Sequence, residues 1–101
     1  MNTFSRSSDF DEWLSKLSDQ KAKARILARL LAASLGNFGD CESVGGGVSE
    51  MRVHVGAGYR IYYTRLGTTA YVLLAGGNQG VAEKDITEAK RMADELQKSK
   101  P

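Results

Sequence analysis

The chain has 101 residues, 42% of them apolar, and a formal net charge of +2. This length predicts one domain over residues 1–101 with a single core, and so small a charge does not by itself indicate a nucleic-acid partner. With one cysteine and one histidine, an intramolecular disulfide, a cysteine-rich zinc site and a multi-histidine metal centre are excluded, and we expect no cofactor. No apolar run is long enough to cross a membrane and none at the start is typical of a signal peptide, so we expect a cytoplasmic protein without a membrane partner.

Two helices are predicted near the start of the chain, after a polar segment at residues 2–7 that permits an edge strand. The first helix is expected to have Ser8 or Asp9 as its N-cap and to run to about Leu17. The second spans Gln20–Leu35, with Asp19 as its N-cap and Gly36 at its end. The buried side of this second helix is expected to consist of Ile26, Leu27, Leu30, Leu31 and Ala33.

The same helix carries cations on the side that we expect to be exposed: Lys21, Lys23, Arg25 and Arg29. A solvated helix face is the usual explanation of such a stripe. The functional alternative is that Lys21, Lys23 and Arg25 bind RNA by following its phosphate backbone. The sequence leaves both interpretations open.

The glycine-rich stretch Gly36–Gly47 is predicted to be a loop. It lacks the Gly-Lys-Ser/Thr ending of a phosphate-binding P-loop, so that interpretation is rejected. Cys41 lies in this stretch, and no neighbour in the sequence would activate its thiol.

A two-stranded ribbon is predicted over Glu50–Arg65. Its first strand alternates Met51, Val53 and Val55 with Glu50, Arg52 and His54. Gly56 and Gly58 bracket the turn, where a positive φ is expected. If the apolar side chains mark the buried face, the opposite face displays Arg52, His54, Arg60 and Tyr62. We predict that this polar face is the functional surface, because guanidinium, imidazole and phenol groups suit phosphate and bases.

A further strand is predicted at Thr68–Ala75, buried on both faces and ended by Gly76 and Gly77. A last helix runs from about Ala82 to Gln97, followed by a frayed tail at residues 99–101. Its apolar stripe is Ile86, Ala89, Ala93 and Leu96. The expected order is β-α-α-β-β-β-α, an α+β domain whose helices pack on a mostly antiparallel, four-stranded sheet.

Several short motifs occur in a recognisable order: Phe10-x-x-Trp-Leu-x-x-Leu-x-Asp, Gly36-Asn-Phe-Gly-Asp, Glu50-Met-Arg, Gly58-Tyr-Arg-Ile-Tyr-Tyr, Gly76-Gly and Asp85-Ile-x-x-Ala-Lys-Arg. This ordered set resembles the RelE/ParE toxin superfamily, specifically its HigB-like branch of addiction module killer proteins. The resemblance extends from about Phe4 to Leu96. It rests on the whole set, because none of the motifs is specific alone.

The resemblance implies a RelE-like fold and a toxin of a type II toxin–antitoxin system. RelE-like toxins are metal-independent endoribonucleases that cut messenger RNA on the ribosome and so inhibit translation, and a cognate antitoxin holds them inactive. In that reaction the ribose 2′-OH attacks the adjacent phosphate. The alternatives are a ParE-like inhibitor that binds DNA gyrase without cleaving RNA, and an attenuated toxin that acts mainly as the antitoxin's partner.

By this resemblance Arg60 matches the arginine of the family's Gly-Tyr-Arg motif and is expected to stabilise the reacting phosphate. Arg52 lies where the family places a basic residue on the preceding strand. From the residues themselves, His54 is a candidate proton donor or acceptor, with a packing role as the alternative. Tyr62 could stack on a base, with an ordinary exposed sheet tyrosine as the alternative.

The chain departs from the family pattern after the last strand. Relatives of this branch usually have Gly-Gly-Asp-Lys there, whereas this chain has Gly76-Gly77-Asn78-Gln79. The Gln79 amide can position a phosphate but cannot neutralise it. The departure puts the rate of cleavage, and cleavage itself, in question.

Overall fold

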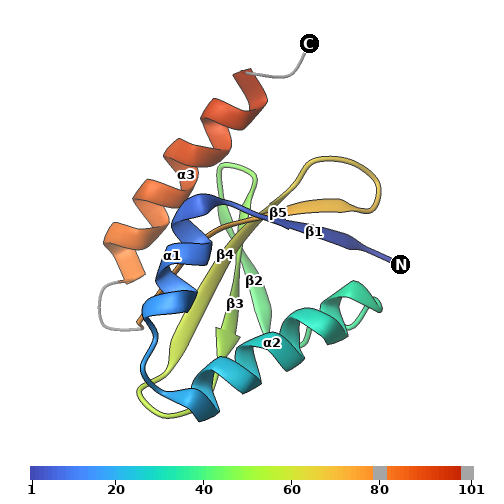
Figure 1. Ribbon diagram of the computed structural model, residues 1–101. Coiled ribbons are helices and arrows are strands. Elements are labelled where there is room, and N and C mark those ends of the chain that lie inside the picture. Colours follow the sequence, from blue (N-terminus) through green and yellow to red (C-terminus); the bar gives the residue numbers. More distant parts are fainter. Residues whose placement is uncertain (79–81, 99–101) are drawn as a thin grey trace.

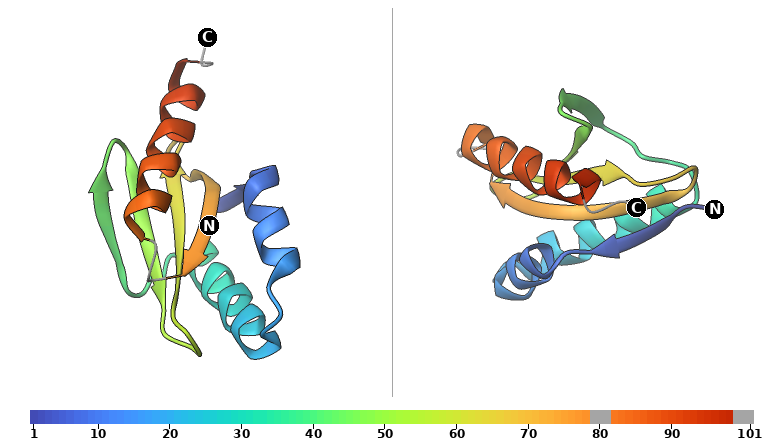
Figure 2. Two further views of the ribbon diagram at one scale, coloured as in Figure 1. Left: turned by 90° about the vertical axis from the view of Figure 1, so that its left-hand side faces the viewer. Right: turned by 90° about the horizontal axis from the view of Figure 1, so that it is seen from above.

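The computed structural model describes residues 1–78 and 82–98, which form an α+β fold with one mixed sheet and helices on both its faces (Figure 1). The elements are β1 (Thr3–Arg6), α1 (Ser8–Lys16), α2 (Gln20–Ser34), β2 (Cys41–Gly45), β3 (Val48–Val53), β4 (Tyr59–Arg65), β5 (Ala70–Asn78) and α3 (Ala82–Lys98). Helices α1 and α2 cover one face of the sheet and α3 covers the other (Figure 2). Within the described residues, no helix is long and apolar enough to cross a membrane.

The sheet has five strands in the order β1-β5-β4-β3-β2. β1 pairs with β5 in parallel, and the other three pairings are antiparallel. The predicted α+β class, the edge strand near the N-terminus and the ribbon of β3 and β4 are confirmed, and Gly56 and Gly58 have positive φ angles of 54° and 84°. The predicted count of four strands is wrong.

The additional strand is β2, which lies within the stretch that we expected to be a loop. It pairs along the outer edge of β3, from Cys41 opposite Met51 to Gly45 opposite Val48. Most of its side chains are exposed, so it is held by backbone hydrogen bonds and has no alternation of buried and exposed residues. A strand of this kind leaves little trace in an apolar pattern.

β5 continues through Gly76 and Gly77 to Asn78, so the expectation that the two glycines end the strand is wrong. A Cβ atom at Gly76 would collide with the ring of Trp13, and one at Gly77 with the carboxylate of Asp85. These glycines therefore let α1 and α3 approach opposite faces of the same strand closely.

Both early helices begin at side-chain caps. The Ser7 hydroxyl accepts from the Phe10 N–H at 3.0 Å, and the Asp19 carboxylate accepts from the Ala22 N–H at 3.1 Å. The predicted start of α2 is confirmed, whereas the expected N-cap of α1 is wrong: it is Ser7 and not Ser8 or Asp9.

The predicted buried side of α2 is only partly correct. Ala22, Ile26, Leu30 and Ala33 are buried, whereas Leu27, Leu31 and Leu35 are 40%, 64% and 65% exposed. These three leucines follow one another at intervals of four and form a stripe along the helix. We call Leu27, Leu31 and Leu35 the leucine stripe.

Apolar side chains fill both sides of the sheet. The cluster beneath α1 and α2 consists of Phe10, Leu14, Ala22, Ile26, Leu30, Ala33, Met51, Val53, Tyr59, Ile61, Tyr63 and Leu73. The cluster beneath α3 consists of Val48, Tyr62, Val72, Leu74, Ala89 and Ala93, with Ile86 and Leu96 at its margin. The predicted apolar stripe of the last helix is thus confirmed, and it covers the sheet face that carries Arg60 and Tyr62.

Candidate functional site

Two arginines on neighbouring strands share one buried carboxylate. Arg52 of β3 and Arg60 of β4 lie directly opposite each other in the antiparallel register. Arg52 Nε donates to Glu50 Oε1 at 3.0 Å, and Arg60 Nη1 donates to both Glu50 oxygens at 2.7 and 2.9 Å. Opposed like charges destabilise a sheet, so Glu50 between them is what allows both guanidiniums to occupy this position.

Burial makes this arrangement rigid. The Glu50 side chain is 3% exposed, and those of Arg52 and Arg60 are 26% and 23% exposed. A buried carboxylate with two charge-assisted partners has little freedom to turn away. The expectation that Arg60 is displayed freely to solvent is therefore wrong, although part of each guanidinium remains accessible.

An acidic rim surrounds the two arginines. Arg52 also contacts Asp40 Oδ1 at 3.1 Å and Glu42 Oε2 at 2.6 Å. The hydrogen bond from His54, followed by that from Arg52, lowers the pKa of Asp40, while partial burial opposes this. The carboxylates, Glu42 first, raise the pKa of Arg52.

His54 is held by the same rim. Its Nε2 lies 2.7 Å from Asp40 Oδ2, and its side chain is 63% exposed. Because the Asp40 contact uses Nε2, Nδ1 is the ring atom left to face a substrate. We call Glu50, Arg52, Arg60, His54 and Asp40 the arginine cluster.

The expectation that Tyr62 is exposed for stacking on a base is wrong. Tyr62 is fully buried beneath α3, although it lies on the same sheet face as Arg60. Burial, together with the charges of Glu50 and Asp85, raises the pKa of its hydroxyl to about 12. Tyr62 is therefore a neutral core residue behind the arginine cluster.

Three buried polar atoms at or near Tyr62 have no hydrogen-bond partner within the described residues. They are Arg60 Nε, Tyr62 Oη and Asp85 Oδ2. Asp85 lies in the first turn of α3, and burial raises the pKa of its carboxyl against the opposing effect of Lys84. The start of α3 thus closes the inner side of the cluster with the partly desolvated carboxyl group of Asp85.

The predicted RNA-binding lysines and arginine of α2 are not brought to the arginine cluster. Lys21, Lys23 and Arg25 lie on α2, which covers the opposite face of the sheet (Figure 2). Arg29 is not part of an exposed stripe, because it donates to the backbone oxygens of Arg52 at 2.6 Å and Phe38 at 3.1 Å. The predicted RNA-binding residue Gln79 lies outside the described residues.

Sequence reasoning missed three acidic residues of the site. Glu50 shares the period-two face of Arg52, so the alternation along β3 could have identified it. Asp40 and Asp85 come from a different loop and from the last helix, and no local pattern links them to the ribbon. Among residues 1–78 and 82–98, no group of three or more His, Cys, Asp or Glu side chains is arranged to hold a metal ion.

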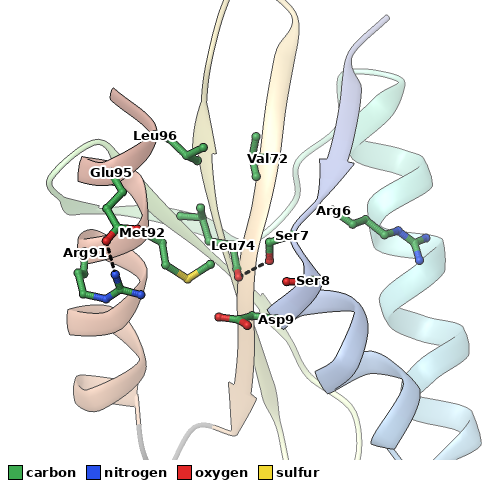
Figure 3. Close-up of a pocket in the computed structure, with 10 residues that line it drawn as sticks. All are labelled: Arg6, Ser7, Ser8, Asp9, Val72, Leu74, Arg91, Met92, Glu95 and Leu96. Atoms are coloured by element: carbon green, nitrogen blue, oxygen red, sulfur yellow. Dashed lines mark hydrogen bonds and ion pairs between the residues drawn. The ribbon is translucent and has the colours of Figure 1, made fainter. Parts of the chain in front are cut away.

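A groove of about 420 Å³ lies between α3 and the start of α1 (Figure 3). Its floor and one wall are apolar, formed by Val72, Leu74, Met92 and Leu96. Several polar groups on its rim already have partners, because the Ser7 hydroxyl donates to Leu74 O at 2.7 Å and Arg91 pairs with Glu95 at 2.6 Å. The arginine cluster, which lies elsewhere, remains the candidate functional site.

Comparison with known proteins identifies a close relative. No model of a described protein family matches the chain. An uncharacterized protein of Haemophilus influenzae is 46% identical over 87 residues, which cover 86% of this chain and 88% of that protein. Identity at this level over nearly the full length of both proteins shows that the chain belongs to the same family as this Haemophilus influenzae protein.

Proposed function

We propose that the protein is the toxin of a type II toxin–antitoxin pair, with a RelE-like fold, and that it cleaves messenger RNA on the ribosome without a metal. The mixed sheet, with two helices on one face and one on the other, supports the fold assignment in its general form. The ordered motifs of the sequence support the family assignment. The arginine cluster supports the activity.

The observation that carries the proposal is the fixed pair Arg52 and Arg60 beside His54. Cleavage through the 2′-hydroxyl adds negative charge to the phosphate in the transition state, and preorganised cations stabilise that charge. Glu50 holds the two guanidiniums side by side before any substrate arrives. Asp40 holds the imidazole in the way that an acidic partner orients a catalytic base.

In the proposed reaction, the phosphorus exchanges its bond to the 5′-oxygen for a bond to the 2′-oxygen. The 2′-oxygen forms a bond to phosphorus while the bond from phosphorus to the 5′-oxygen breaks, leaving a 2′,3′-cyclic phosphate and a 5′-hydroxyl. Nδ1 of neutral His54 accepts the 2′ proton, and water supplies the proton of the departing 5′-oxygen. Arg52 and Arg60 neutralise the charge of the phosphate throughout the reaction. At Arg52, the phosphate takes the place of the Asp40 and Glu42 carboxylates.

The proposal includes a cognate antitoxin that binds this chain tightly. The leucine stripe supports a protein partner, because exposed leucines in a row are typical of interaction surfaces. The cations of α2 support an acidic one, since α2 contains no acidic residue from Gln20 to Ser34. The antitoxin would cover this helix or the arginine cluster.

Induction of the protein in cells, followed by mapping of RNA ends, tests the activity. We expect new ends within translated messages. His54→Gln should reduce their yield about a hundredfold or more, the range lost with a general base. Arg91→Gln, on the rim of the groove between α3 and the start of α1, removes a charge away from the cluster and should leave cleavage unchanged.

The alternative function, inhibition of DNA gyrase, is favoured by one specific observation. The carboxylates of Asp40, Glu42 and Glu50 pair with Arg52 or Arg60, so the cluster has little free positive charge for RNA. Measurement of DNA supercoiling in the same cells separates the two functions. Loss of supercoiling without new RNA ends would refute the nuclease and support the gyrase inhibitor.

A further inference from the structure

A second cavity lies on the sheet face opposite the arginine cluster. Its volume is about 360 Å³, and its lining includes Phe38, Cys41, Ser49, Tyr63, Arg65 and Tyr71. These residues come from the segment before β2 and from all four antiparallel strands. We call this cavity the aromatic pocket.

The rings of the aromatic pocket hold one another in place. Phe38 and Tyr63 are stacked, with ring centres 5.8 Å apart and planes 25° apart. Tyr71 lies 5.4 Å from Phe38 and 6.1 Å from Tyr63, and is stacked in turn on Phe4 at 5.1 Å. A set of rings packed against one another offers a flat ligand a surface that needs no rearrangement.

The polar groups of the pocket suit a ligand that carries a negative charge and also has hydrogen-bonding groups. Arg65 Nε donates to Gly67 O at 2.7 Å and Nη2 donates to Thr68 O at 2.9 Å. These bonds fix the guanidinium with two of its five N–H donors, leaving others for a ligand. Burial and the neighbouring Cys41 thiol raise the pKa of the Tyr63 hydroxyl, so it stays protonated at neutral pH.

The charge of the lining decides between two kinds of ligand for aromatic cavities. Quaternary ammonium groups bind aromatic cages, but a fixed guanidinium repels them and no carboxylate is among the lining residues. A nucleobase stacks on aromatic side chains and on arginine, and its phosphate is attracted by that arginine. We propose that the aromatic pocket binds the nucleobase of a nucleotide, with Arg65 contacting its phosphate.

This proposal is independent of the arginine cluster. The sheet separates Arg65 and Tyr71 from Arg60, whose side chain points to the α3 face. The pocket would bind a nucleobase whether or not the protein cleaves RNA. The base could belong to a free nucleotide or to an RNA strand.

Cys41 provides a direct reporter, because it is the single cysteine of the chain, is exposed and lines the pocket. We would measure alkylation of Cys41 by iodoacetamide in the full chain with AMP, GMP, CMP or UMP added up to about 10 mM, a concentration that saturates weak sites. We expect at least one nucleotide to slow alkylation severalfold, while ribose 5-phosphate has no effect. Protection by none of the four, or equal protection by ribose 5-phosphate, would overturn the proposal.

Two variants place the ligand. Arg65→Gln should weaken protection by the nucleotide about tenfold and leave that by the corresponding nucleoside unchanged, and Tyr71→Leu should weaken both. In Arg60→Gln, whose substitution lies on the other face, the nucleotide should protect Cys41 as it does in the natural chain. If Arg60→Gln alone abolishes protection while its circular dichroism spectrum matches that of the natural chain, the nucleotide binds the arginine cluster and the pocket assignment is wrong.

Comparison of ligands then identifies the source of the base. If a hexamer of uridine or adenosine protects Cys41 at lower concentration than the mononucleotide does, the base belongs to a strand. Protection at equal concentration indicates a free nucleotide. Protection by choline in place of nucleotides would show a cation cage and contradict the proposal.

Discussion

The ring of Trp13 occupies the position in which a Cβ atom of residue 76 would lie. The ring cannot yield easily, because Phe10 and Tyr59 pack on it with ring centres 5.8 and 6.2 Å away. Gly76→Ala should therefore destabilise the fold by about 1–3 kcal/mol, the usual cost of overpacking. Gly67→Ala is the matched control, since its Cβ would meet only the Ala70 methyl at 3.9 Å. Urea unfolding of both variants measures the difference, and equal stability would contradict the close packing of Trp13 against residue 76.

Removal of the Glu50 charge should destabilise the protein strongly. Glu50→Gln keeps the shape of the side chain but leaves two opposed arginines without their shared carboxylate. The loss should lie near the lower end of roughly 3–5 kcal/mol, because the guanidiniums keep some contact with water. Glu42→Gln removes an exposed partner of Arg52 and should cost less than about 1 kcal/mol. A similar loss for both variants would show that Glu50 does not organise the cluster.

Asp85 should make stability depend on pH in a particular direction. Burial raises its folded pKa above the ordinary value of 3.8, so the folded state binds the proton more tightly than the unfolded state. The stability that protonated Asp85 contributes to the folded state is complete below pH 3.8 and is lost as the pH rises through the folded pKa. Asp85→Asn imitates the protonated form, and should therefore gain stability relative to the natural chain between pH 3 and pH 7. Urea unfolding at both pH values checks this, and a constant difference would contradict it.

Two adjacent leucines of α2 should respond very differently to truncation. Leu30 is 8% exposed and packs in the core, whereas Leu31 is 64% exposed on the leucine stripe. Leu30→Ala should cost about 2–5 kcal/mol of folding stability. Leu31→Ala should change it by less than about 0.5 kcal/mol. Thermal unfolding of the isolated protein measures both, and a large loss for Leu31→Ala would show that the stripe is covered in solution.

The sequence predicted the helices, the ribbon and its turn because each has a local cause. Side-chain caps, helical spacing of apolar residues and glycines at positive φ act within a few positions. β2 and the continuation of β5 through Gly76 and Gly77 have no such cause. They are set by backbone pairing and by side chains that arrive from α1 and α3.

The site was predicted in part for a related reason. Alternation along β4 correctly placed Arg60 and Tyr62 on one face, but it does not reveal what covers that face. α3 covers Tyr62 fully and Arg60 only partly, so one became a core residue and the other a member of the cluster. Asp40 reaches the cluster through the pairing of β2 with β3, a tertiary event that no local pattern encodes.

The parallel pairing of β1 with β5 also constrains when the fold can form during synthesis. Thr3–Arg6 leaves the ribosome well before its partner strand Ala70–Asn78. Contacts between such distant segments form slowly, because a long loop must close before they contribute any stability. The floor beneath both α1 and α3 is β5, so the arginine cluster gains its inner wall only once β5 has joined the sheet. A nascent chain that ends before β5 would thus contain Arg52 and Arg60 without the assembled site, and would lack the proposed activity while it is still being made.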